Sequence, residues 1–368
     1  MNGALVIDSP GDLGPAVMLA VADGAALELG AALRESLGVH RLRVLAALDN
    51  EESVYGVNTG MGAASEIRLD TAAQSVQQDN LMLARAVGSA PWLNRREARV
   101  AVAARLRSFL DGDAGVSAEL CQGLIDLLNR GLHPAIPRTR NGAAGEIIPL
   151  AHLGGCITGS GRFIEGGIAV PATPVLTAAG LAPLHLGPKE GVALIEGIPV
   201  TTGLAILQVR AARLLADQSI AALSAGLVLI NANRNPFGKA VARANPELAV
   251  VVGAVRRLAG DQTLPRSLQA PLSFRVAAPA AAQLLRSAAA LGQAVDRALD
   301  GVTDSPAFLD GRFTGTAGFD GFDLAAGLDG LRLSVTHLAE TSAARLHRLL
   351  DERVTGLPRQ LSDRPGLH

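Results

Sequence analysis

Long stretches in which alanine, leucine and arginine recur at helical spacing do most to limit what this chain can fold into. They cover residues 203–231, 247–260, 276–300 and 323–352. Apolar residues repeated every three or four positions give a helix one apolar face, and long helices bury such faces by packing together. The spacing therefore predicts a bundle of long helices over residues 203–368.

The first 202 residues predict shorter helices separated by loops rich in glycine and proline. Helical periodicity covers residues 70–88, 94–111, 117–130 and also 16–49, where we expect Gly24, Gly30 and Gly38 to mark breaks or caps. An irregular connection runs from His133 through Pro149. A second irregular zone spans 154–191, with two short β-like pieces around 162–170. We therefore expect an all-α fold in two parts, a loop-rich, mostly helical region over 1–202 and the long-helix bundle over 203–368.

Composition excludes several classes of protein. The chain has 368 residues, 49% of them apolar and 18% charged, which is typical of a globular protein. A formal net charge of −1 gives no electrostatic reason to bind nucleic acid or an anionic membrane. Cys121 and Cys156 form no metal-ligand pattern, so we expect no metal site.

The sequence also favours a cytoplasmic protein. No apolar run reaches the roughly 18 residues needed to span a bilayer, and the longest, around Ile220 to Ile230, predicts a buried helix. Asp8 and Asp12 precede the first apolar stretch without a basic region, which is unlike a signal peptide.

A glycine-rich loop contains the only tyrosine of the chain, in Tyr55-Gly-Val-Asn58-Thr-Gly60. Taken alone, the loop is explained by a tyrosine that packs at a helix end and glycines that turn the chain. There is no P-loop, no HExxH motif and no nucleophile elbow to assign a reaction.

Three later segments change that interpretation, namely GAAGEIIPLAH over 142–152, LGPKEGVALIEG over 186–197 and QAPLSFR over 269–275. Together with the tyrosine loop, they resemble four segments of the aromatic amino acid ammonia-lyases in the same order and at similar spacing. The resemblance extends over nearly the whole chain. It implies an α-helical fold with a long-helix bundle and a homotetramer whose sites combine residues from several subunits.

The resemblance fails at the residues from which that family builds its cofactor. Family members cyclise an Ala-Ser-Gly tripeptide into methylidene-imidazolone, and the serine hydroxyl is the group that leaves. Here the tripeptide is Ala143-Ala144-Gly145, and the methyl group of Ala144 has nothing to expel. We therefore expect no such cofactor and no release of ammonia from histidine, phenylalanine or tyrosine.

Other family positions are changed or retained. Glu196 stands where the family has an active-site asparagine, Arg85 follows Ala84 where histidine ammonia-lyases have a Ser-His pair, and Leu272 replaces a tyrosine. The sequence ends at His368, where family members continue into a helical tail with a further active-site glutamate. The resemblance retains Tyr55 as the general base and Arg275 as the partner of the substrate carboxylate. Substrate contacts are implied for Asn58, Arg85, Gln269, Arg275 and Phe319.

Without the electrophile, acid–base catalysis of roughly 10²–10⁴-fold is too weak to remove a β-proton from an unactivated amino acid. We therefore expect Tyr55 and Glu196 to act as an acid–base pair on a small, already activated substrate. Such a pair could catalyse dehydration, conjugate addition, cyclisation or isomerisation. We expect the reaction to belong to bacterial specialised metabolism. Glu196 could instead be solvated or paired with Arg85, and Arg275 could be structural.

Two other functions remain open from the sequence. The chain could be a non-catalytic binding or scaffold protein that kept the bundle, or one subunit of a split enzyme whose missing C-terminal part comes from a separate chain. A pocket that holds Tyr55, Glu196 and Arg275 together, with Arg275 supplied by a neighbouring subunit, would distinguish an enzyme from a scaffold.

Overall fold

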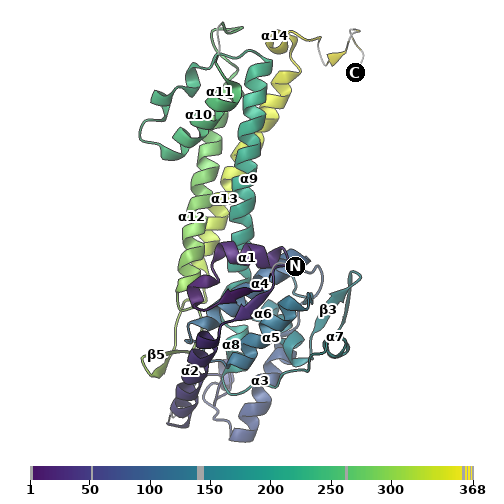
Figure 1. Cartoon of the computed structure of the whole chain (residues 1–368), viewed down its shortest axis with the longest axis vertical. Coiled ribbons are helices and arrows are strands. Elements are labelled where there is room, and N and C mark those ends of the chain that lie inside the picture. The colour runs from purple at the N-terminus through teal and green to yellow at the C-terminus, as the bar shows by residue number, and fades with distance from the viewer. Residues whose placement is uncertain are drawn as a thin grey trace. The chain divides into compact units, whose positions relative to one another are not determined.

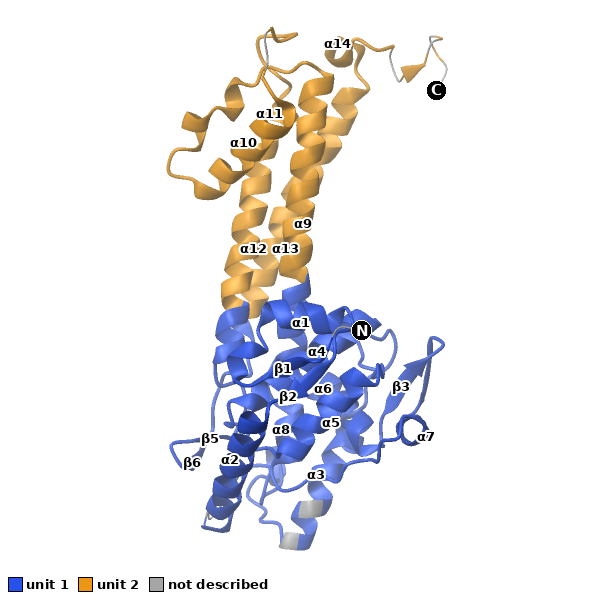
Figure 2. Cartoon of the chain, viewed as in Figure 1, with its two compact units in different colours: residues 1–207, 295–322 blue, residues 208–294, 323–368 orange. Residues whose placement is uncertain are grey.

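The computed structural model describes residues 3–50, 53–138, 145–261 and 264–358, together with 361, 362, 364 and 366; at 71 and 75 it describes the backbone alone. Figure 2 shows the chain divided into two compact units. Unit 1 contains residues 1–207 and 295–322, and unit 2 contains 208–294 and 323–368. The boundary predicted after residue 202 falls close to this division, but residues 295–322 return to unit 1.

Unit 1 is mostly helical, as the periodicity predicts (Figure 1). The helix α3 packs against α6 and α8, and α4 packs against α1 and α5. Its helices are α1 (Pro15–Ala22), α2 (Ala31–Asn50), α3 (Thr71–Arg85), α4 (Arg95–Leu110), α5 (Ala118–Asn129), α6 (Ile147–Thr158), α7 (Ala172–Ala178) and α8 (Glu190–Ile195), with short 3-10 turns η1 (Pro10–Asp12) and η2 (Gly62–Ala64).

Side-chain caps explain where three of these helices begin. The Asp70 carboxylate accepts from the backbone N–H of Ala73 at the start of α3. Asn94 caps α4, and Glu97 completes the capping box. Ser117 caps α5. Each cap satisfies a backbone N–H that the first turn of a helix leaves without a partner.

The described residues of unit 1 also form three two-stranded sheets. The predicted β-like pieces around 162–170 are confirmed as the antiparallel pair β3 (Arg162–Glu165) and β4 (Ile168–Pro171). The other pairs are β1 (Leu5–Ile7) with β2 (Leu27–Leu29), which are parallel, and β5 (Ala307–Leu309) with β6 (Arg312–Thr314), which are antiparallel.

Two details of the predicted helices are wrong. Gly38 is no break, because it lies inside the continuous helix α2. The zone predicted as irregular on both sides of residue 150 contains the buried helix α6. Gly154 makes this packing possible, since a Cβ atom there would lie 2.2 Å from the Met82 sulfur on α3. Close packing thus stabilises a helix that its own glycines disfavour.

Unit 2 contains the long helices that the sequence predicts. The hydroxyl groups of Ser287 on α12 and Ser334 on α13 lie 2.7 Å apart, and Gly327 of α13 faces Leu291 of α12. Its elements are α9 (Pro199–Leu229, which begins in unit 1), η3 (Asn235–Phe237), η4 (Lys239–Ala242), α10 (Pro246–Ala259), α11 (Leu272–Arg275), α12 (Ala277–Asp300), α13 (Phe322–Leu349) and α14 (Glu352–Thr355).

One helical stretch among the described residues, Glu190–Leu229, is long and apolar enough to cross a membrane. However, 83% of its most apolar window is buried inside the structure. Burial of this kind is typical of a core helix and not of a membrane span. The run that was predicted to be buried, around Ile220 to Ile230, is only partly buried, because Val228 and Leu229 are exposed.

Candidate active site

The tyrosine loop is held by its own polar groups. The buried Asn58 accepts a hydrogen bond from the Val54 backbone N–H through its side-chain oxygen (2.6 Å). The Tyr55 hydroxyl accepts from the Gly62 N–H (2.9 Å), and the tyrosine is 43% exposed. Asn58 therefore shapes the loop, whereas Tyr55 presents its ring and hydroxyl at the surface of unit 1.

Gln78 connects this loop to α8. Its side-chain amide donates to the Gly56 carbonyl and accepts from the Val192 N–H, both at 3.2 Å. Gln78 is fully buried, and a Cβ atom at Gly191 would lie 2.4 Å from the Gln78 carbonyl oxygen. The loop that carries Tyr55 and the helix α8, which directly precedes Glu196, are therefore both joined to α3 through one side chain.

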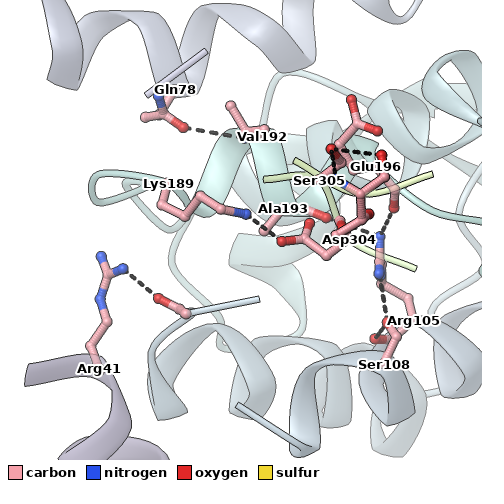
Figure 3. Close-up of polar contacts among 12 residues, drawn as sticks. Arg41, Gln78, Arg105, Ser108, Lys189, Val192, Ala193, Glu196, Asp304 and Ser305 are labelled. Atoms are coloured by element: carbon pink, nitrogen blue, oxygen red, sulfur yellow. Dashed lines mark hydrogen bonds and ion pairs between the residues drawn. The ribbon is translucent and has the colours of Figure 1, made fainter. Parts of the chain in front are cut away.

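Glu196 lies at the C-terminal end of α8, and its backbone carbonyl contacts the fully buried Arg105. The Arg105 guanidinium, from α4, donates to the carbonyl oxygens of Ala193 (2.9 Å) and Glu196 (Figure 3). These carbonyls are among the last of the helix, where backbone acceptors lack partners and a cation is favourable. Arg105 thus fixes the end of α8 and, with it, the position of Glu196.

A buried ion pair between Lys189, which directly precedes α8, and Asp304 also acts on Glu196. The Lys189 ammonium contacts one carboxylate oxygen of Asp304 at 2.5 Å, and both side chains are buried. Among the described residues, the second Asp304 oxygen has no hydrogen-bond partner. Lys189 also has a φ of 74°, a left-handed conformation that is uncommon for a residue other than glycine. The fold thus holds this lysine in place against a local conformational cost.

The surroundings of Glu196 change its acidity. Burial raises the pKa of Glu196 to about 7, and the negative charge of Asp304 acts in the same direction. The positive charges of Lys189 and Arg105 oppose the shift without cancelling it. A carboxyl group that titrates near neutral pH can both give and accept a proton there.

Glu146 has a different role from Glu196. Its carboxylate accepts from the backbone N–H groups of Val200 (2.6 Å) and Thr201 (2.7 Å), the first turn of α9. Burial raises the pKa of Glu146, and these hydrogen bonds oppose the increase. Glu146 therefore serves as a helix cap.

The tripeptide Ala143-Ala144-Gly145 stands where the family builds its cofactor, and the structure describes only Gly145 of it. Ala143 and Ala144 lie outside the described residues. Gly145 has a φ of 72°, and a Cβ atom there would lie 3.3 Å from the Gly197 carbonyl oxygen and 3.7 Å from the Phe319 Cβ. The end of this segment therefore adjoins the residue that follows Glu196, and the half-buried Phe319 lies beside it.

The remaining predicted site residues are Arg85, Gln269 and Arg275. Arg85 is exposed at the end of α3. Gln269 and Arg275 belong to unit 2, where Gln269 is exposed and Arg275 ends α11 half-buried. Convergence of Tyr55, Glu196 and Arg275 on one cavity stays a prediction. The solvated alternative for Glu196 is wrong, because the residue is buried, whereas the ion-paired alternative stays a hypothesis.

Sequence reasoning missed the roles of Arg105, Lys189, Asp304 and Gln78. One signal was available, since Lys189 and Lys239 are the only lysines in an arginine-rich chain. Among the described residues, no group of three or more His, Cys, Asp or Glu side chains could hold a metal ion. The described part of the site in unit 1 contains buried charges and hydrogen bonds.

The connection through Gln78 predicts a large difference between two adjacent glutamines. Gln78→Met leaves the Gly56 carbonyl and the Val192 N–H buried without partners, which is expected to cost about 2–4 kcal/mol in the free energy of unfolding. Gln77→Met is the matched control, since Gln77 is half-buried with one long hydrogen bond of 3.4 Å, and should cost less than about 1 kcal/mol. Equal losses in urea unfolding would contradict the assigned role of Gln78.

Comparison with known proteins identifies the family. The family model described as aromatic amino acid lyase matches residues 13–368. Histidine ammonia-lyase of Geobacillus thermodenitrificans is 32% identical over 355 residues, covering 93% of this chain and 69% of that protein. Histidine ammonia-lyase of Gloeobacter violaceus is 32% identical over 364 residues, covering 95% of this chain and 71% of that protein. The chain belongs to the aromatic amino acid lyase family and spans about 70% of the length of these relatives.

Solved structures confirm the predicted ammonia-lyase-like helical fold. Ergothionase from Treponema denticola superposes with a TM-score of 0.92 at 23% identity, covering 99% of this chain and 75% of that one. Tyrosine aminomutase from Streptomyces globisporus gives 0.91 at 25% identity, covering 100% and 75%. The fold is thus common to ergothionase and an aminomutase and does not by itself name a reaction.

Proposed function

We propose that this chain is a diverged aromatic amino acid lyase homologue that works without the electrophilic cofactor and carries out acid–base chemistry on a small, already activated substrate. The residues at 143–145 do not fit methylidene-imidazolone, because Ala144 has a methyl group where the cyclisation needs a hydroxyl to leave. The substrate must therefore supply its own activation, such as a carbonyl group, an enone or a good leaving group.

The buried Glu196 carboxyl group is the observation that carries this proposal. A pKa of about 7 matches the pH at which a cytoplasmic enzyme works, so both protonation states are populated. A neutral amide at this position, as in the family, could not titrate. The exchange of amide for acid thus adds a proton donor and acceptor where the electrophile is missing.

Tyr55 is the proposed partner of Glu196. Its loop is joined to α8 through Gln78, and its hydroxyl accepts one hydrogen bond, so it can still donate its own proton. In the proposed reaction, one of these groups removes a proton next to the activating carbonyl and the other returns a proton to the product. Arg275, whose Nε is buried without a hydrogen-bond partner among the described residues, is the proposed carboxylate or oxyanion clamp.

The cofactor-free state is tested by mass and by product. The intact mass of the purified protein should equal that of the unmodified chain, and histidine, phenylalanine and tyrosine should release no ammonia. A histidine ammonia-lyase measured in parallel is the control for both assays. A mass lower by two water molecules, or measurable urocanate or cinnamate, would contradict the proposal.

The acid–base role of Tyr55 is tested with Tyr55→Phe. This change removes one hydroxyl from a partly exposed side chain, so the midpoint of thermal unfolding should stay within a few degrees. Turnover of an activated substrate should fall about 100-fold or more. A fully active Tyr55→Phe protein would exclude Tyr55 from the mechanism and leave Glu196 as the candidate.

A further inference from the structure

A cavity of about 370 Å³ lies between the tyrosine loop and α3. One wall comes from the loop residues Gly60, Met61, Ala64, Ile67 and Leu69, and the other from Gln77, Asn80, Leu81, Ala84 and Arg85 on α3. The five positions on α3 follow the pattern i, i+3, i+4, i+7 and i+8, so they form one face of the helix. The volume of the cavity lies within the range of small-molecule sites in proteins.

The lining combines an apolar body with a single cation. Met61, Ile67, Leu69 and Leu81 supply apolar surface, and the described lining contains no aspartate or glutamate. Arg85 is the one charged residue that lines the cavity, and no described carboxylate lies within ion-pair distance of it. An uncompensated guanidinium favours an anion, which it can bind with two parallel hydrogen bonds.

The cavity adjoins Tyr55. The Tyr55 hydroxyl accepts from the Gly62 N–H, next to the lining residue Met61. A Cβ atom at Gly56 would lie 3.1 Å from the Met61 side chain. A molecule in the cavity would thus contact the loop that positions the tyrosine.

We propose that this cavity binds a small molecule with an apolar body and an anionic end group, a carboxylate or a phosphate, and that Arg85 binds the anionic end. The inference rests on the proposed acid–base function only in treating this molecule as the substrate. The purely structural alternative is that Arg85 complements the C-terminal end of α3. In that case Arg85→Gln would change stability but would not change the ranking of ligands.

The chain has four methionines, and the one that lines the cavity, Met61, can report on ligand binding. Met18 and Met82 are fully buried, Met1 is terminal, and Met61 lines the cavity. With ¹³C-methyl-methionine labelling, the Met61 signal, assigned through Met61→Leu, should shift saturably on titration with ligand, while the Met18 signal stays in place. The probes are 3-phenylpropanoate, 2-phenylethyl phosphate and the uncharged 3-phenylpropanamide.

The full-length protein should bind at least one of the two anions about 10-fold more tightly than the amide at low salt. Arg85→Gln should abolish that preference, and Arg85→Lys should restore part of it. Arg43→Gln, which removes an exposed arginine from α2, should behave like the unchanged protein. Tighter binding of the carboxylate or of the phosphate identifies the anion and supports the proposal in either case.

Two results would overturn the inference, namely equal binding of the amide and both anions, or no Met61 shift with any probe. These outcomes are independent of the proposed catalysis, because they measure binding without turnover. The same titration on Tyr55→Phe should still shift Met61. Loss of activity in that variant with binding intact would separate the catalytic proposal from the cavity.

Discussion

Replacing Lys189 by methionine is expected to lower the free energy of unfolding by about 3–5 kcal/mol. The substitution leaves the Asp304 carboxylate buried without its cation, and the other oxygen of that carboxylate already lacks a described hydrogen-bond partner. Methionine has a similar length and must adopt the same left-handed backbone conformation as lysine. The expected loss therefore comes from the unpaired charge and not from a change in backbone strain.

The second lysine of the chain is the matched control for this experiment. Lys239 is exposed on η4, so Lys239→Met should change the free energy of unfolding by no more than about 0.5 kcal/mol. Combining Lys189→Met with Asp304→Leu removes both charges and should regain most of the loss. Urea unfolding of the unchanged protein, Lys189→Met, Asp304→Leu and the double variant gives the coupling energy between the two side chains.

Similar stabilities for Lys189→Met and Lys239→Met would show that water reaches the Asp304 carboxylate. The ion pair would then not be buried in solution. A double variant as unstable as Lys189→Met would instead indicate that the lysine side chain packs the interior, independently of its charge.

The second large effect is a pH-dependent stability that depends on Glu196. In the folded protein this carboxyl group holds its proton up to a pH of about 7, whereas the ordinary pKa of a glutamate is 4.5. Between these values the folded state binds a proton that the unfolded state has released. The free energy of unfolding therefore decreases as the pH rises through this window, by about 3 kcal/mol from this one group.

Glu196→Gln isolates that contribution, because the amide cannot titrate. The difference in unfolding free energy between Glu196→Gln and the unchanged protein should shift by about 3 kcal/mol in favour of the variant between pH 4.5 and pH 8. Glu35→Gln, at an exposed position on α2, controls for the loss of one acidic residue. A difference that stays constant with pH would exclude the raised pKa and remove the main support for Glu196 as an acid or base.

The sequence by itself predicted the helical architecture, which solved structures confirm, and it is the basis for proposing that the family's cofactor is absent. The long helices follow from apolar residues at helical spacing, a local pattern that survives in any packing arrangement that buries one face. Caps such as Asn94 and Ser117 depend only on the residues next to them. The inability of Ala144 to form the electrophile is a matter of covalent chemistry, so it required the alignment of the tripeptide and no coordinates.

The tertiary structure alone decided the electrostatics of the site. Lys189 and Asp304 are far apart in the chain, and Arg105 comes from a third segment, so no sequence spacing predicts that they surround Glu196. The pKa of Glu196 depends on burial and on the positions of these charges, both of which are properties of the packed fold. Helix α6 was missed for a related reason, because it is buried against α3 and α8, and this packing is a property of the tertiary structure and not of the local sequence.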